Sequence, residues 1–366
     1  MPVYPLRGVN VDFPHEAYPC QLAYMEKVIQ SCQQSKHAML ESPTGTGKTL
    51  CLLCASTSWR RSRPDAPAQK IIYSSRTHSQ LSQVMKELKS TSAKGKVKVA
   101  LLGSRSQLCV HPDVQALNGT AQKHACQKLI KGQSCKYYKG VRPTLNKNPD
   151  LSKEIRDIED LVDLGKSHCT CPYYLSRHAA ESADMVMLPY NYLVDPSVRD
   201  GLSLINGNLV IFDEAHNLET QCCEASSIDL TPEIWRACVR ETEFATHLVE
   251  KEREAAVQMG EKQRMDETVR EIADMKTVVR SLEALAKSIN SKGAMKEATN
   301  GKQLSQLLHE ASIDYRNLNK FNSVIETIEL KIAEHNQMTA SVENAEDNSR
   351  SSALSVLKKL VKVLAA

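Results

Sequence analysis

Residues 41–49 read Glu41-Ser42-Pro43-Thr44-Gly45-Thr46-Gly47-Lys48-Thr49. The apolar run Ala38-Met39-Leu40 precedes them, and a longer apolar run over 50–55 follows. A strand, a glycine-containing loop and a helix, in this order, are typical of a loop that binds nucleotide phosphates. Glycines let successive backbone N–H groups turn inward around a phosphate chain, and the helix start adds its own N–H groups. We therefore predict a strand over 38–40, a phosphate-binding loop and a buried helix.

The side chains of this loop fit the same chemistry. Lys48 can reach the β- and γ-phosphates of a nucleotide, and the Thr49 hydroxyl can ligate Mg²⁺. The usual spacing, G-x-x-x-x-G-K-[ST], has a glycine where this chain has Ser42. Because of this departure, the assignment needs support from a second element.

That support comes from the apolar run 209–212, which is followed by Asp213-Glu214-Ala215-His216. An apolar strand that ends in two acids is where a P-loop ATPase holds Mg²⁺ and polarises the attacking water. We predict that Asp213 binds the metal, directly or through water, and that Glu214 is the general base. Together the two motifs predict an ATPase.

Composition limits the remaining possibilities. The chain has 366 residues, which suggests about two domains. Its formal net charge is only +4, so a nucleic-acid surface must come from local clusters of charge. No apolar run approaches the ~20 residues that span a bilayer, and the N-terminus lacks the apolar region of a signal peptide. We expect an intracellular protein with no membrane partner.

Further apolar runs at 70–74, 97–102 and 184–188 alternate with helical patterns, which predicts a mostly parallel α/β sheet. Polar residues follow these strands, where such sheets bind ligands. After about residue 220 the pattern is helical only, which predicts a separate helical domain. Its apolar residues recur at steps of three and four, as at Val269, Ile272, Met275, Val279 and Leu282.

The insertion between the runs at 97–102 and 184–188 is rich in cysteine: Cys109, Cys126, Cys135, Cys169 and Cys171. Four thiolates can hold either Zn²⁺ or an iron–sulfur cluster. Structural zinc usually draws on close C-x₂₋₄-C pairs. The gaps between the first three cysteines and Cys171 are 16, 8 and 35 residues, which fits a cluster that joins several loop segments. Spacing alone leaves open both the metal and the choice between Cys169 and Cys171.

The same insertion carries five lysines between 114 and 139, with Tyr137 and Tyr138 among them and no acid. Cations for phosphates and rings for stacked bases suit a single nucleic-acid strand. A solvated helical face is the alternative explanation.

The order of these motifs resembles the iron–sulfur superfamily 2 DNA helicases related to the xeroderma pigmentosum group D helicase (XPD). The stretches that carry the resemblance are Glu41–Cys54, Ser75–Gln80, Gly103–Pro112, Cys171–Ser176 and the D-E-A-H motif. It covers residues 1 to about 235, and beyond that it rests on position and helical character. In this family a serine at the position of Ser42 is usual.

The resemblance implies a role for each matching residue. Catalysis falls to Lys48, Asp213, Glu214 and His216. ATP and Mg²⁺ are bound by Ser42, Pro43, Thr44, Gly45, Thr46, Gly47, Lys48, Thr49 and Asp213, with Phe13, Tyr18 and Gln21 on the adenine side. The [4Fe–4S] ligands are Cys109, Cys126, Cys135 and Cys171, the last favoured over Cys169 by the context Cys-Pro-Tyr-Tyr. DNA is gripped by Arg76, Thr77, His78 and Arg105.

The resemblance also implies a domain plan and an activity. A RecA-like motor lobe is formed by 1–105 and 176–232, an iron–sulfur domain by 106–175, and an incomplete helical arch by 233–366. The family uses ATP, Mg²⁺ and a [4Fe–4S] cluster to move 5′ to 3′ on single-stranded DNA and to dismantle structured DNA in the nucleus.

One feature of the family is missing. We find no G-R-x-x-R-like run and no second α/β lobe over 236–366. Without the arginine finger of that lobe, catalysis falls by ~10³–10⁵ in comparable enzymes. The alternative is therefore a truncated, non-catalytic chain that binds ATP and DNA.

Overall fold

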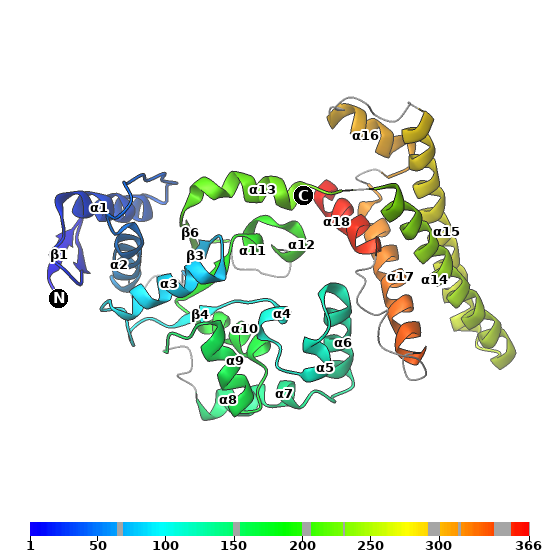
Figure 1. The fold of residues 1–366 in the computed structure, drawn as a ribbon, viewed down its shortest axis with the longest axis horizontal. Coiled ribbons are helices and arrows are strands. Elements are labelled where there is room, and N and C mark those ends of the chain that lie inside the picture. The colour runs from blue at the N-terminus through cyan, green and yellow to red at the C-terminus, as the bar shows by residue number, and fades with distance from the viewer. Residues whose placement is uncertain are drawn as a thin grey trace. The chain divides into compact units, whose positions relative to one another are not determined.

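The computed structural model describes residues 1–63, 69–148, 154–199, 206–229, 231–291, 301–313, 316–339 and 353–365. The chain forms two compact units, shown with their elements labelled in Figure 1. We call residues 1–116 with 126–225 the α/β unit, and residues 117–125 with 226–366 the helical unit.

The α/β unit is built on a four-stranded parallel sheet in the order β4-β5-β3-β6. Its strands are β3 (Ile71–Ser75), β4 (Val99–Leu101), β5 (Met185–Pro189) and β6 (Leu209–Phe212). Every residue of β3 and β5 is buried, as expected of central strands covered on both faces. The predicted α/β class with a parallel sheet is confirmed.

The strand predicted over 38–40 is wrong. These residues form no strand, and Met39 is 100% exposed. Among the described residues β6 is an edge strand that pairs with β3 alone, so residues 38–40 are not hydrogen-bonded to it as a fifth strand. Three apolar residues become a strand only where a neighbour satisfies their N–H and C=O groups, and here that neighbour is lacking.

A short antiparallel hairpin, β1 (Val3–Leu6) and β2 (Val9–Asp12), is absent from our sequence predictions. Arg7 and Gly8 join the strands, both at positive φ, as a two-residue hairpin turn requires. Val9 and Val11 alternate with polar residues and are buried, which was the signal available in the sequence.

Helices cover the sheet and build the cysteine-rich insertion of the α/β unit. Those near the two ATPase motifs are α1 (Pro19–Gln34), α2 (Lys48–Arg61), α3 (His78–Lys89), α11 (Asn191–Val194), α12 (Pro196–Arg199), η2 (Ala215–Asn217) and α13 (Leu218–Ser226). Those of the insertion are α4 (Arg105–Leu108), α5 (Pro112–Gln115), α6 (Gly119–Lys131), α7 (Lys136–Lys139), α8 (Val141–Lys147), α9 (Ile158–Ser167) and α10 (Pro172–Ser182).

The described part of the helical unit contains helices and no strand, as predicted. They are α14 (Pro232–Met259), α15 (Lys262–Ser291), α16 (Gly301–Glu310), α17 (Leu318–Thr339) and α18 (Ala353–Ala365), together with residues 119–125 of α6. Their apolar faces share one core, which includes Met275, Leu282, Ile325, Ile328 and Leu357. None of the helices described in either unit is long and apolar enough to span a bilayer.

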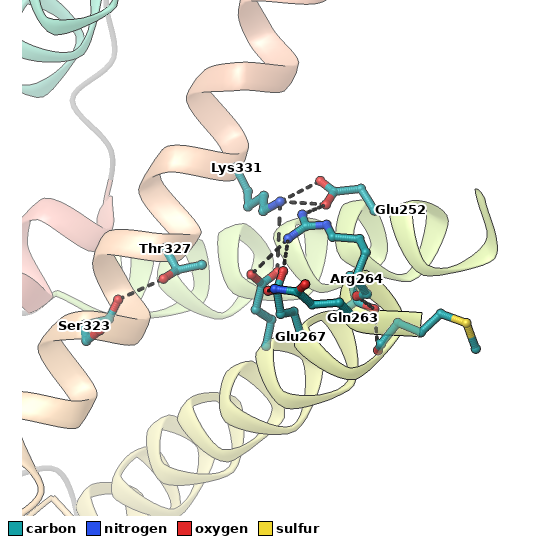
Figure 2. Close-up of polar contacts among 10 residues, drawn as sticks. Glu252, Gln263, Arg264, Glu267, Ser323, Thr327 and Lys331 are labelled. Atoms are coloured by element: carbon teal, nitrogen blue, oxygen red, sulfur yellow. Dashed lines mark hydrogen bonds and ion pairs between the residues drawn. The ribbon is translucent and has the colours of Figure 1, made fainter. Parts of the chain in front are cut away.

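An ion-pair network joins three of these helices (Figure 2). Lys331 of α17 donates to both carboxylate oxygens of Glu252 of α14, each at 2.7 Å. Arg264 of α15 also pairs with Glu252, and it lies 3.3 Å from Glu267. The Lys331 side chain is only 10% exposed, so its charge depends on ion pairs with Glu252 at 2.7 Å and, more distantly, Glu271 at 4.0 Å.

Candidate functional site

The phosphate-loop segment has the conformation that its glycines permit. Gly45 and Gly47 have φ of 79° and 72°, a region that other residues rarely adopt. The Lys48 ammonium donates to the Ser42 carbonyl at 2.9 Å, and the Thr46 hydroxyl donates to the Pro43 carbonyl at 2.8 Å. These bonds turn the loop back on the first residue of α2.

Ser42, which stands in place of the usual glycine, takes part in this closure. Its hydroxyl oxygen lies 2.5 Å from that of Thr46. The serine therefore adds a side-chain contact across the loop that a glycine could not make.

Gln21 connects the start of α1 to the loop. Its side-chain oxygen accepts from the Tyr18 N–H at 2.9 Å, and its amide donates to the Thr46 carbonyl at 3.0 Å. Tyr18 is 68% exposed, so its ring is available to a ligand. Phe13 is only 1% exposed and packs in the core with Val11, so the adenine contact predicted for it is not available in this structure.

Asp213 follows β6 and is 6% exposed. Its Oδ2 accepts from the Thr49 hydroxyl at 3.4 Å and from the Tyr73 hydroxyl at 2.7 Å. Burial raises the pKa of Asp213, and the hydrogen bond from Tyr73 opposes that rise. The two motifs predicted to share one Mg²⁺ thus meet at one carboxylate.

Two tyrosines at this carboxylate were not among the residues predicted from sequence. Burial and the charge of Asp213 raise the pKa of Tyr73 well above its usual value, so its hydroxyl keeps its proton. Tyr190 donates to the backbone carbonyl of Asp213. For Tyr73 the available signal was a tyrosine that follows two isoleucines in a predicted strand, since a buried hydroxyl needs a partner.

The other acid of the motif heads a chain of polar contacts. Glu214 Oε2 lies 3.3 Å from His216 Nδ1, and Asn217 donates its amide to His216 Nε2 at 2.9 Å. The Arg76 guanidinium then donates to the Asn217 side-chain oxygen at 3.4 Å. This arrangement places the proton of a neutral His216 on Nδ1, facing Glu214. The D-E-A-H motif is therefore linked to Arg76, at the neighbouring strand end.

The other residues predicted to grip DNA differ in their availability. Arg76 is exposed. The Thr77 hydroxyl caps α3 by accepting from the Gln80 N–H at 3.2 Å. His78 is half-buried, burial lowers its pKa, and its Nδ1 has no hydrogen-bond partner in the described structure. Burial therefore favours the neutral form of the His78 ring.

Four of the five cysteines in the insertion line a single cavity: Cys109, Cys126, Cys135 and Cys171. Cys169 is exposed, has φ of 48° and does not line the cavity. Burial raises the pKa of Cys171 to about 12, and backbone hydrogen bonds from Tyr174 and Tyr173 act against this rise.

The cysteines surround a space instead of converging on a point. Among the described residues, no three His, Cys, Asp or Glu side chains are close enough to hold one metal ion. The thiolates of a cubane cluster stand further apart than the ligands of a single ion, because they bind separate iron atoms. Backbone N–H groups directed at the sulfurs, as at Cys171, suit thiolate ligands. Four cysteine sulfurs at one cavity are compatible with the ligand set of an iron–sulfur cluster.

Arg105 lies beside this cavity. Its guanidinium is 4.3 Å from the centre of the Tyr173 ring, donates to the Tyr174 hydroxyl at 3.4 Å, and hydrogen-bonds Cys126. A cation on an aromatic face and next to a thiol is engaged within the protein. These contacts give no support to the DNA role predicted for Arg105.

The tyrosines of the lysine-rich stretch also lie at the cavity. Tyr137 and Tyr138 both line it, and the Tyr138 ring meets that of Tyr174 edge-on at 4.9 Å. Their rings are thus partly used in packing, which reduces the surface they could offer to stacked bases.

Comparison with known proteins gives consistent similarities. The family model described as DEAD_2 matches residues 73–234. The chain is 43% identical over 292 residues to the "Regulator of telomere elongation helicase 1 homolog" of Oryza sativa subsp. japonica, covering 68% of this chain and 29% of that protein. It is 43% identical over 272 residues to the "Regulator of telomere elongation helicase 1" of Homo sapiens, covering 63% of this chain and 22% of that protein.

The chain thus spans less than a third of the length of these curated relatives. Among solved structures, one titled "XPD_Helicase" aligns with a TM-score of 0.47 and 16% identity, over 95% of this chain and 51% of that one.

Proposed function

The chain belongs to the XPD-like superfamily 2 helicases, and we propose on this basis that it supplies the first motor lobe of an ATP-dependent 5′–3′ DNA helicase. In this proposal residues 1–105 and 176–232 form the lobe, 106–175 hold an iron–sulfur cluster, and 233–366 form part of a helical arch. The substrates are single-stranded and structured DNA, and the work is genome maintenance in the nucleus, including telomeres.

One observation carries the proposal. The Thr49 hydroxyl and the Asp213 carboxylate, 164 residues apart in the chain, meet at 3.4 Å beside the phosphate loop. Hydroxyl and carboxylate oxygens are suitable ligands for Mg²⁺, and the family places the metal between these motifs. Bound Mg²⁺ neutralises charge that develops on the β- and γ-phosphates.

The chain's own residues divide the remaining tasks. Lys48, now bonded to the Ser42 carbonyl, exchanges this partner for phosphate oxygens when ATP binds. Glu214 is exposed and accepts the proton of the attacking water, and His216 donates to its carboxylate to hold it in place. Tyr18 stacks on adenine. Gln21 either hydrogen-bonds the adenine or links the adenine side of the site to the loop through its hydrogen bond to the Thr46 carbonyl.

We further propose that the cavity of Cys109, Cys126, Cys135 and Cys171 holds a [4Fe–4S] cluster. The support is a single cavity lined by all four of these cysteines. Visible absorption of anaerobically purified protein tests this. A cluster gives a broad absorption band and a brown sample, whereas zinc gives a colourless one.

The deciding experiment is ATP hydrolysis by this 366-residue chain, with and without single-stranded DNA, beside Lys48→Ala. DNA-stimulated turnover that the substitution abolishes establishes the enzyme. Failure of the wild-type chain to bind ATP would contradict the proposal.

A second candidate function is that the chain binds ATP and DNA without turnover. The described residues contain one parallel sheet and no second α/β lobe that could supply an arginine finger. ATP binding without hydrolysis, in the same experiment, would favour this candidate.

A further inference from the structure

Tyr73 is the central residue of β3 and is 0% exposed. Its hydroxyl donates to Asp213 Oδ2 at 2.7 Å, and this is the shorter of the two hydrogen bonds that this oxygen accepts from side chains. The other comes from Thr49. A phenol, an alcohol and a carboxylate from β3, α2 and the end of β6 therefore meet at one oxygen atom.

Resting on the function proposed above, we propose that Tyr73 is a positioning residue for Mg²⁺. Its rigid ring, fixed in a buried strand, directs a hydrogen bond that holds the Asp213 carboxylate in the orientation in which it shares the metal with Thr49. A carboxylate rotates easily about its last bond, because that torsion is broad. Without Tyr73, part of the metal-binding free energy must be used to order Asp213.

The alternative is a purely structural role, in which Tyr73 fills the core and uses Asp213 only as a hydrogen-bond acceptor for its buried hydroxyl. Tyr190 provides a matched control, because its hydroxyl also donates to Asp213, but to the backbone carbonyl. Removing that hydroxyl disturbs the same residue without freeing its carboxylate. A purely structural role predicts similar effects of the two tyrosine-to-phenylalanine changes.

The test measures binding of a fluorescent, non-hydrolysable ATP analogue to the full chain while Mg²⁺ is titrated, and again in EDTA. For Tyr73→Phe we expect the half-saturating Mg²⁺ concentration to rise about tenfold, as for loss of one hydrogen bond to a charged group. We expect affinity in EDTA to stay within about twofold. Tyr190→Phe should change the Mg²⁺ requirement by less than about threefold.

A double-mutant cycle shows whether the effect passes through the carboxylate. In an Asp213→Ala background, Tyr73→Phe should no longer change the Mg²⁺ requirement. The phenylalanine keeps the buried ring, and thermal unfolding of each variant reports whether the fold is retained.

The proposal is overturned if Tyr73→Phe has the Mg²⁺ requirement of wild type, if it weakens binding equally in EDTA, or if its effect persists without Asp213. These results leave the proposed function standing, because wild type still binds the analogue with Mg²⁺. A wild-type chain that binds no nucleotide at any Mg²⁺ concentration overturns both.

Discussion

Asp213 shows how a single residue acquires its chemistry from distant parts of the chain. A carboxylate that is 6% exposed must find hydrogen-bond partners, since unsatisfied buried charge is costly. Its partners, Thr49 and Tyr73, come from two other elements. Phe13 and Tyr18 also differ as single residues, because Phe13 lies in the core and Tyr18 lies at the surface.

The contrast between Phe13 and Tyr18 gives a prediction. Phe13→Ala should lower the free energy of unfolding by about 3–5 kcal/mol, as for other buried phenylalanines. Tyr18→Ala should leave the free energy of unfolding within about 0.5 kcal/mol and reduce the preference for ATP over other nucleotides. Urea unfolding and competition binding measure the two effects. Equal losses of nucleotide preference in both variants would contradict the assignment.

At the scale of elements, β3 and β6 bring together the segments that we predict to act in ATP hydrolysis and in DNA binding. They are neighbours in a parallel sheet, so their carboxyl ends meet at one edge. Asp213 to Asn217 follow β6, and Arg76 follows β3. The polar chain from Glu214 through His216 and Asn217 to Arg76 is the resulting contact between motifs.

We expect this polar chain to couple the two ligands. Asn217→Ala removes both of its inner hydrogen bonds, so the change in single-stranded DNA affinity on addition of a non-hydrolysable ATP analogue should shrink by about fivefold. Fluorescence anisotropy of labelled DNA, with and without the analogue, measures it. Gln221→Ala, likewise half-buried and four residues further along the chain, is the control. Unchanged coupling in Asn217→Ala would exclude this route.

The ion pairs of the helical unit predict a pH dependence. Partial burial alone raises the pKa of Glu252, but hydrogen bonds and charges from Lys331 and Arg264 outweigh it and leave the pKa lowered. A lowered pKa in the folded state gives stability that is complete above the unfolded value and is lost as pH falls through the folded value.

Lys331→Met should therefore cost about 1 kcal/mol of unfolding free energy at pH 7, and progressively less as pH falls through the lowered pKa of Glu252. Guanidinium unfolding monitored by circular dichroism over a series of acidic pH values measures this. Lys320→Met is the control, because Lys320 is exposed and forms its ion pair with Asp274. A cost for Lys331→Met that does not depend on pH would contradict the role of Glu252.

At the scale of the whole molecule, the cysteine cavity joins segments that local structure does not hold together. Its four sulfurs come from α6 and from the ends or starts of α4, α7 and α10, which span residues 105–182. Three of these cysteines are buried, and the fourth is half-buried. A group bound to all four would cross-link most of the insertion.

Loss of the proposed cluster should therefore destabilise the α/β unit. Oxidation with ferricyanide in the presence of a chelator should bleach the visible absorption. It should also lower the thermal unfolding temperature of the α/β unit by several degrees. Cys171→Ser should do the same, whereas Cys169→Ser should retain the absorption and the transition temperature, because Cys169 does not line the cavity. Equal effects of the two serine variants would contradict the assignment of ligands.

Sequence and structure agree where the relevant signal is local. The parallel sheet and the helical unit follow from apolar runs and periodic spacing, which are properties of short segments. The strand predicted over 38–40 failed because a strand depends on its neighbour. The contacts of Arg105 could not be inferred from spacing, because Tyr173 and Tyr174 are almost 70 residues away in the chain, and its DNA role stays a prediction.

The sequence by itself determined the chemistry that this chain carries: a phosphate loop, a D-E-A-H motif, a set of cysteines and membership of a helicase family. These depend on residue types at fixed spacing, which can be read directly from the sequence. Only the tertiary structure decided which cysteine completes the cavity, which aromatic ring stays exposed beside Gln21, and which hydroxyls meet at Asp213. The physical reason is that burial and hydrogen-bond partners depend on contacts between distant segments, which spacing along the chain does not encode.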